Sequence, residues 1–282
     1  MIRTTYRRYI TACVVLPLLL LIVLYLPLWC FGLVVVVFST LAQREANVLL
    51  TQAQLTSDKI GIHVLTVTAI VLSVFAEPYW YYAVLFLTFP LMYLSSGLNA
   101  PSPVQRLESY SLSIFTFLLI AIGMGHMNLL MRIGVSTDLN DTSLGRFAVI
   151  YLLAVVWIGD TGAYHVGRKW GKRILSPMIS PKKTWEGLGG SIVASLMAAF
   201  LFRYILNLHV LGWRSTFAVG ILLPLVGLLG DLTESVFKRA ANAKDSGNLI
   251  PGHGGIFDRI DSMLFSAPLL YFLLLFAISN QS

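Results

Sequence analysis

The sequence predicts an all-α integral membrane protein with about nine transmembrane helices and a cytoplasmic N-terminus. The chain of 282 residues is 57% hydrophobic and only 12% charged, whereas soluble domains carry about 25% charged residues. Its apolar residues form long runs, and stretches such as 18–21 (four Leu) and 34–37 (four Val) do not alternate as barrel strands do. Because a bilayer core offers the backbone no hydrogen-bonding partners, runs of this length are expected to be helices.

Pro, Gly and charged clusters separate the predicted spans, and the distribution of basic residues orients them. With the N-terminus inside, every Lys and Arg lies on the cytoplasmic side except Arg132, Arg146, Arg203 and Arg214. The apolar run that follows Arg7 and Arg8 is too long for a signal peptide, so it is expected to be a retained anchor. The spans lie near 9–25, 27–42, 60–76, 79–96, 110–127, 147–165, 187–206, 214–231 and 260–279.

The composition also limits the partners that the protein can have. The net charge of +7 fits cytoplasmic loops beside anionic lipid or a nucleotide, so we expect no nucleic-acid partner. Cys13 and Cys30 both lie in apolar segments, and they indicate neither a disulfide nor a metal site.

The polar residues are distributed unevenly along the chain and predict two functional regions. Residues 1–146 are expected to form lipid-facing helices with possible dimer contacts, and residues 147–282 a catalytic region with cytoplasmic loops at 166–186 and 232–259. The segment from Arg44 to Asp58 is polar enough for an interfacial helix, with Val48, Leu49 and Leu55 facing lipid.

Carboxylates gather around the last two predicted spans. Asp231 ends an apolar run, and Glu234 and Lys238 follow on the same helical face. Asp258 and Asp261 lie three residues apart where the last span begins. Acidic side chains at bilayer depth are costly and are kept mainly for function, and such carboxylates suit divalent cations that bridge phosphate oxygens. Two plainer interpretations stay open, namely that Asp258 is a helix N-cap and that Asp231 is an interfacial carboxylate.

A glycine-rich turn precedes the last span. Gly252, Gly254 and Gly255 would let backbone amides approach an anion, although a tight turn between helices needs glycines as well. His253 has the chemistry to donate to a phosphate, but a single histidine in a loop more often has no such role.

The earlier polar segment carries Asp160 within an apolar run, which indicates either a role in the site or a buried polar partner. The basic residues that follow suit a triphosphate or a lipid phosphate, and equally suit the setting of topology. Lys182 and Lys183 are the basic residues closest to the next span, and Ser180 and Thr184 beside them have hydroxyl groups that could help to hold a metal or orient a phosphate.

Read together, these segments resemble the phosphatidate cytidylyltransferase (CDP-diacylglycerol synthase) family. The resemblance rests on Ser-Val-Phe-Lys-Arg at 235–239, Lys-Asp-Ser-Gly at 244–247 and Pro-Gly-His-Gly-Gly-Ile-Phe-Asp-Arg-Ile-Asp at 251–261. Two earlier blocks, 159–164 and 180–187, occur in the order that the family shows. One departure is that Glu45 is followed by Ala46, where the family has an acidic residue and then an aromatic one.

The resemblance implies a nucleotidyltransferase of phospholipid biosynthesis in the cell (inner) membrane, with its active site facing the cytoplasm. It implies a homodimer that transfers a cytidylyl group from CTP to phosphatidic acid with Mg²⁺ and a monovalent cation such as K⁺. The implied metal ligands are Asp231 and Asp258, with Asp160 and Asp261 as further candidates. The implied catalytic and phosphate-binding residues are Lys238, Arg239, Lys244, His253 and Arg259. The candidate nucleotide-binding residues are Ser180, Lys182, Lys183, Thr184, Gly254 and Gly255.

Two alternatives remain at this point. The first is a CTP-dependent relative that acts on another lipid, such as an isoprenoid alcohol or an ether lipid. The second is a secondary transporter, which is disfavoured because the polar clusters lie in loops on one side and no internal repeat is visible.

Overall fold

A computed structural model describes residues 17–55, 57–95, 102–136, 142–247, 249 and 254–280. Apart from one short hairpin, the regular structure in these residues is helical. The chain divides into two compact units: the first comprises 1–129 and 236–260, and the second comprises 130–235 and 261–282. The division of function at residue 146 stays a prediction.

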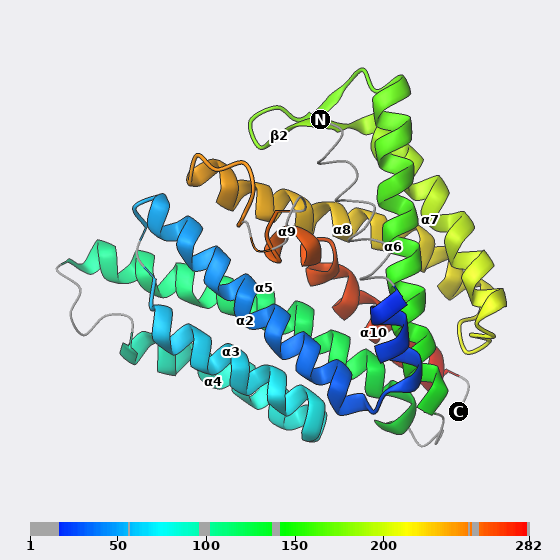
Figure 1. Ribbon diagram of the computed structural model, residues 1–282, viewed down its shortest axis with the longest axis horizontal. Coiled ribbons are helices and arrows are strands. Elements are labelled where there is room, and N and C mark those ends of the chain that lie inside the picture. The colour runs from blue at the N-terminus through cyan, green and yellow to red at the C-terminus, as the bar shows by residue number, and fades with distance from the viewer. Residues whose placement is uncertain are drawn as a thin grey trace. The chain divides into compact units, whose positions relative to one another are not determined.

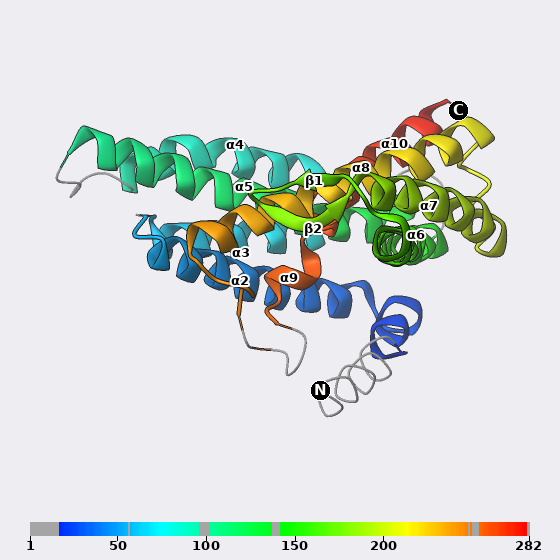
Figure 2. The same ribbon diagram turned by 90° about the horizontal axis from the view of Figure 1, so that it is seen from above.

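The first unit consists mainly of long helices that run alongside one another in two layers (Figures 1 and 2). Helix α2 packs against α3 and α9, and α3 packs against α4. Asp58 caps α3, because its carboxylate accepts a hydrogen bond from Gly61 N at 3.0 Å. The elements of this unit are α2 (Leu28–Gln52), α3 (Lys59–Phe75), α4 (Pro78–Ser95), most of α5 (Pro103–Ser136), the end of α8 (Trp213–Ala240) and α9 (Phe257–Ile260).

Aromatic packing fixes the end of α8 within this unit. Phe237 is buried and stacks against Phe115 of α5, with ring centroids 6.1 Å apart. On its other side it meets Phe257 of α9 edge to face at 5.7 Å. These contacts hold the last turn of α8 in a defined position, which matters because Lys238 is the next residue.

The second unit is built around the closely packed pair α6 and α7. Glycines permit the close approach: a Cβ at Gly162 would collide with Ala194, and a Cβ at Gly190 would collide with Val166. The elements of this unit are α6 (Thr142–Trp170), β1 (Ile174–Ser176), β2 (Ser180–Thr184), α7 (Trp185–Ile205), most of α8 and α10 (Met263–Ser279).

The antiparallel hairpin β1–β2 joins α6 to α7 and was not predicted from the sequence. Ile174 pairs with Thr184, and the hairpin merges directly into α7. Thr184 Oγ1 accepts a hydrogen bond from Gly187 N at 3.1 Å and so caps α7. Glu186 Oε2 accepts from Lys172 N and Arg173 N at 3.1 and 3.2 Å, which ties the hairpin to that helix. Strands this short, one of them carrying two lysines, give little of the alternation by which strands are recognised.

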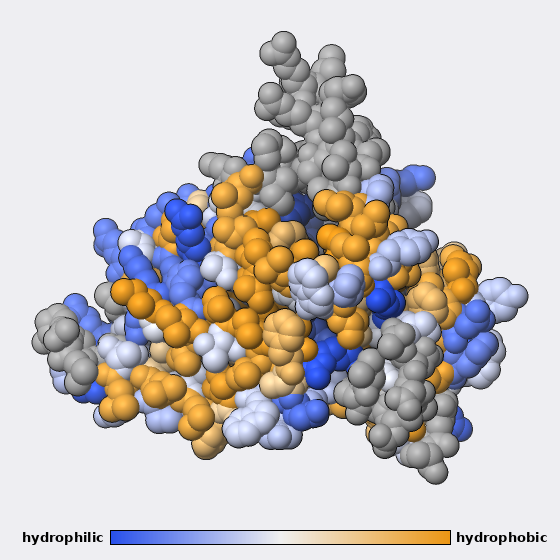
Figure 3. Space-filling view, turned by 60° about the horizontal axis from the view of Figure 1, so that its bottom comes forward, coloured by the Kyte–Doolittle hydropathy of each residue, from blue (hydrophilic) through white to orange (hydrophobic). Residues whose placement is uncertain are grey.

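The membrane-protein class is confirmed: within the described parts of the chain, six helices are long and apolar enough to cross a bilayer. Figure 3 shows apolar side chains covering wide areas of the face in view. Every predicted span within the described residues overlaps a helix, but the total of nine and the cytoplasmic N-terminus stay predictions. The six helices are Leu28–Gln52, Pro103–Gly134, Ser143–Trp170, Trp185–Ile205, Trp213–Ala240 and Phe257–Ser279, the last including the short break after α9.

The stretch Arg44–Asp58 does not form a separate interfacial helix as predicted, although Val48 is exposed as expected. Helix α2 continues without a break to Gln52, and Leu49, which was expected to face lipid, is only 1% exposed. The reason is tertiary: this part of α2 packs on α9, and the carboxylate of Glu45 is buried. The polar loops also begin later than the sequence indicated, because α6 continues to Trp170 and α8 to Ala240.

Candidate functional site

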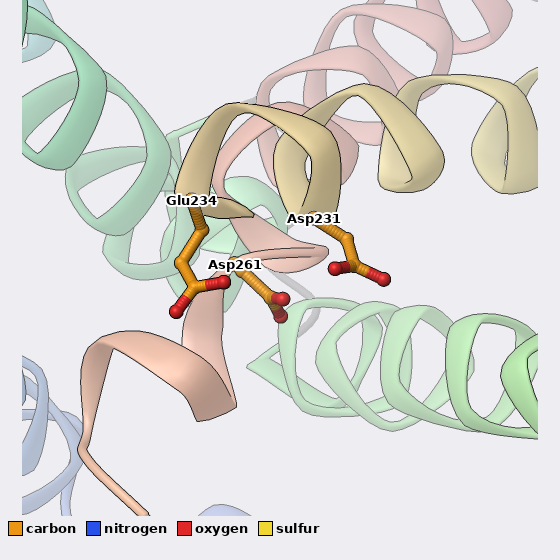
Figure 4. Close-up of side chains that lie close together, drawn as sticks. All are labelled: Asp231, Glu234 and Asp261. Carbon is orange, nitrogen blue, oxygen red and sulfur yellow. The ribbon is translucent and has the colours of Figure 1, made fainter. Parts of the chain in front are cut away.

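Three carboxylates of the second unit come together below α8 (Figure 4). Asp231 and Glu234 lie one turn apart on α8, and Asp261 lies in the turn between α9 and α10. One carboxylate oxygen from each falls within 4.8 Å of the others. Glu234 is completely buried, while the other two are partly exposed. We call these residues the acidic trio.

Gly230 allows the acidic trio to form. The backbone of α8 passes so close to Asp261 that a Cβ at position 230 would collide with the Asp261 carbonyl oxygen. Asp261 is further oriented by its own turn, because its Oδ1 accepts a hydrogen bond from Ser262 N at 2.7 Å. The glycine therefore lets α8 approach the turn that carries Asp261, which brings the carboxylates of the two segments close together.

Lys183 and Asp160 complete this cluster. Lys183 extends from β2 and forms an ion pair with Asp231. Asp160 of α6 interacts electrostatically with Asp231 and Lys183, and Asp261 interacts with all three. The structure thus brings together Asp160, Asp231 and Asp261, three of the four acids that the sequence analysis named as metal ligands.

The oxygen atoms of this cluster are suitable ligands for a divalent cation. All of the acidic groups offer carboxylate oxygens, which are the ligands preferred by Mg²⁺ and Ca²⁺. Among these five side chains four are acidic and only Lys183 is basic, and close carboxylates repel one another unless a cation is bound. The acidic trio is accordingly the part of the described chain with the chemistry to hold a metal ion.

The fourth predicted ligand, Asp258, belongs to a separate cluster in the first unit. Its Oδ1 accepts a hydrogen bond from Lys238 Nζ at 2.8 Å. Its Oδ2 accepts from Ser246 N at 2.9 Å, from Ser246 Oγ at 2.8 Å and from Gly255 N at 2.9 Å. Asp258 is therefore not the N-cap that the sequence left open: it lies inside α9 and fastens the preceding loop to the end of α8. Metal ligation by Asp258 stays a prediction.

The two described glycines of the turn serve this second cluster. Gly254 has a φ of +78°, a conformation that favours glycine, and a Cβ there would also collide with the Asp258 carboxylate. Gly255 uses its amide to bind Asp258, so that amide is already engaged. His253 and Gly252, the remaining predicted members of the turn, lie outside the described residues.

The other predicted site residues are more dispersed. Arg239 donates to Ala243 O at 3.5 Å near the end of α8, and Thr184 serves as the cap of α7. Ser180 is partly buried in β2. The residues of this group with exposed side chains are Lys182, Arg239, Lys244 and Arg259.

Sequence reasoning left three residues out of the candidate site. Glu234 was placed on the same helical face as Asp231 but was not named as a ligand, although an acid so close to the end of an apolar run was the available signal. In the structure it is completely buried. Ser246 and Glu45 are linked by a hydrogen bond of 2.9 Å across 201 positions of the chain, a pairing that no local pattern reveals.

Comparison with known proteins assigns the chain to a class. The model of the cytidylyltransferase family matches residues 6–277, so the chain belongs to the cytidylyltransferase family.

Similar curated proteins are phosphatidate cytidylyltransferases of bacteria. That of Haemophilus influenzae is 39% identical over 151 residues, which cover 52% of this chain and 52% of the relative. That of Bacillus subtilis is 48% identical over 135 residues, covering 48% and 50%, and that of Staphylococcus epidermidis is 46% identical over 133 residues, covering 47% and 51%. The chain thus spans about half the length of the curated relatives that it matches.

The geometry at Gly230 leads to a stability prediction. Gly230→Ala is expected to lower stability by about 1–3 kcal/mol, because the new methyl group must displace the Asp261 backbone. In a chain of this size, each kcal/mol corresponds to a fall of roughly 2–4 °C in the unfolding midpoint of the detergent-solubilised protein. Gly227→Ala on the same helix is the control, since its methyl group would meet Ser262 and Ser266 at ordinary contact distances. Equal midpoints for the two variants would contradict the proposed contact.

Proposed function

We propose that this protein transfers a cytidylyl group from CTP to phosphatidic acid, giving CDP-diacylglycerol and pyrophosphate. The observation that carries the proposal is the acidic trio with Lys183 beside it, in a chain whose family is that of the cytidylyltransferases. The names of the bacterial relatives supply the lipid substrate. Family membership also favours a transferase over the transporter that the sequence left as an alternative.

The reaction needs no covalent enzyme intermediate. An anionic oxygen of the phosphatidic acid phosphate attacks the α-phosphorus of CTP and forms a new P–O bond. The bond from that phosphorus to the oxygen bridging the α- and β-phosphates breaks, and pyrophosphate leaves with the electron pair. Since both reactants are polyanions, the main task of the protein is to neutralise charge and to align the reacting groups.

The acidic trio supports Mg²⁺ as the cofactor. In this proposal Asp231, Glu234 and Asp261 hold the ion, Asp160 adds negative charge nearby, and a monovalent cation such as K⁺ accompanies it. When bound, the metal supplies positive charge to phosphate oxygens that carry more negative charge in the transition state.

Basic side chains neutralise the rest of the negative charge on the substrate phosphates. Lys183 is positioned by the hairpin and already pairs with one carboxylate, so a phosphate can draw it away as it arrives. Lys238 is held by Asp258, which fixes the ammonium group at the end of α8 for phosphate binding. We assign the exposed Lys182, Lys244 and Arg259 to the attraction of the nucleotide.

We place the protein in the cell membrane as a homodimer, with these loops facing the cytoplasm. CTP is a cytoplasmic metabolite, and the basic residues of the polar segments favour the same side by the positive-inside rule. The ends of helices at a membrane surface are also where a lipid headgroup and a soluble nucleotide meet.

The proposed activity is tested directly with purified protein and radiolabelled CTP. We expect labelled CDP-diacylglycerol to form with phosphatidic acid and not with diacylglycerol, because the attacking group must be a phosphate. Transfer to diacylglycerol at a comparable rate, or to an isoprenoid phosphate in preference to phosphatidic acid, would refute the assignment of substrate.

Two substitutions test the acids. Asp231→Asn and Asp258→Asn are each expected to reduce kcat on the order of 10³-fold. The first removes a ligand of the proposed metal ion and the second releases Lys238, so each should cost several kcal/mol of transition-state stabilisation. Only Asp231→Asn should also raise the Mg²⁺ concentration needed for half-maximal rate, because Asp231 belongs to the acidic trio and Asp258 binds Lys238 and loop amides. The control is Asp245→Asn, at an exposed position beside the same loop. Rates within about tenfold of the parent for both variants would mean that the essential carboxylates lie elsewhere.

Topology is tested by labelling single cysteines after replacement of Cys13 and Cys30. We expect Met178→Cys at the hairpin tip, which is 90% exposed, and Leu249→Cys, which is 51% exposed, to react only when a membrane-impermeant maleimide reaches the cytoplasmic side. Labelling of both cysteines in intact cells would place these loops outside and overturn the orientation.

A further inference from the structure

A buried carboxylate on α2 holds the loop that carries the second cluster. Glu45 is only 5% exposed, although it lies far in sequence from the polar segments of the site. Its Oε1 accepts a hydrogen bond from Ile256 N at 3.1 Å, and its Oε2 accepts from Phe257 N at 2.8 Å. These are the two amides immediately before Asp258, so Glu45 fixes the backbone from which Asp258 extends.

The same carboxylate reaches Asp258 by a second route. Ser246 Oγ lies 2.9 Å from Glu45 Oε2 and 2.8 Å from Asp258 Oδ2, so its single proton is shared between two carboxylates. Asp258 N in turn donates to Ser246 Oγ at 3.3 Å. Glu45, Ser246 and Asp258 therefore form one network inside the first unit, and it ends at Lys238 Nζ.

Two glycines pack directly against the carboxylate of Glu45. A Cβ at Gly247 or at Gly255 would collide with the Glu45 carboxylate, so the loop closes tightly over it. A carboxylate can accept from all of these donors at once because it has two oxygens and only acceptor sites. A carboxamide of the same shape would turn an NH₂ group towards one of the donors.

We infer that Glu45 is a positioning residue for the transferase reaction: it holds the 254–258 segment so that Asp258 and Lys238 keep their geometry. Glu45 does not touch the reacting groups in this inference, and it acts through Ile256, Phe257 and Ser246. The kinetic part of the inference rests on the proposed function, and the structural part does not.

Glu45→Gln tests both parts in the full-length protein. Hydrogen–deuterium exchange should accelerate by about tenfold or more at the amides of residues 256–258, while the α3 peptide 59–75 stays unchanged. With CTP and phosphatidic acid, kcat should fall by roughly tenfold to a hundredfold with the KM for CTP within about threefold, as expected for small misplacements of catalytic groups. The control is Arg44→Gln, at the exposed neighbouring position of the same helix, where both measurements should match the parent.

The outcomes distinguish the positioning role of Glu45 from the proposed transferase function. Unchanged exchange at 256–258 overturns the inference, and so does faster exchange with an unaltered kcat. If the parent protein transfers no cytidylyl group, the proposed function and the kinetic role of Glu45 both fail, and the exchange data alone decide whether Glu45 holds the segment. Should Glu45→Gln not fold, Ser246→Ala removes the shared hydroxyl and is expected to change exchange and kcat in the same directions by a smaller factor.

Discussion

Carboxylates that lie among apolar helices must have their negative charge compensated. The two clusters of this structure meet that requirement in different ways. A buried anion is stable only when it is paired, hydrogen-bonded or bound to a cation. Glu45 and Asp258 meet the requirement with backbone amides, a hydroxyl group and a lysine. In the acidic trio Lys183 pairs with Asp231, and carboxylate oxygens from all three acids lie close enough together to hold a cation.

The two clusters differ in what they do for the chain. Around Asp258 nearly every acceptor position is used internally, so that cluster fixes Ser246 and Gly255 beside α9. Around Asp231 the close approach at Gly230 brings two acids of α8 together with Asp261 of the turn before α10, in an arrangement that suits a bound cation. Such a division, with one rigid cluster and one that is poised for a ligand, is common in enzyme sites, where support and reaction fall to different residues.

Helix α8 links these features along the chain. It carries Asp231 and Glu234 in the second unit and Lys238 in the first, and its last turn is held between Phe115 and Phe257. An α-helix transmits a fixed rotation from residue to residue, so the aromatic contacts at its end also limit how the helix can turn within that unit. Helix α8 extends beyond the apolar run that the sequence identified as a span, and the additional turns carry the charged residues Lys238 and Arg239.

The sequence by itself determined the class of the protein, the helical nature of its spans and the short segments in which the site residues lie. These properties follow from local composition, from apolar run length and from motif spacing, which need no knowledge of partners distant in sequence. Only the tertiary structure decided that Glu45 is buried against residues more than 200 positions away, that Asp258 binds loop amides and Lys238, and that Glu234 joins Asp231 and Asp261. It also revealed the hairpin that brings Lys183 to Asp231. The physical reason is that each of these contacts depends on how separate helices and loops pack, and a chain's local pattern does not record which distant donor will meet a buried acid.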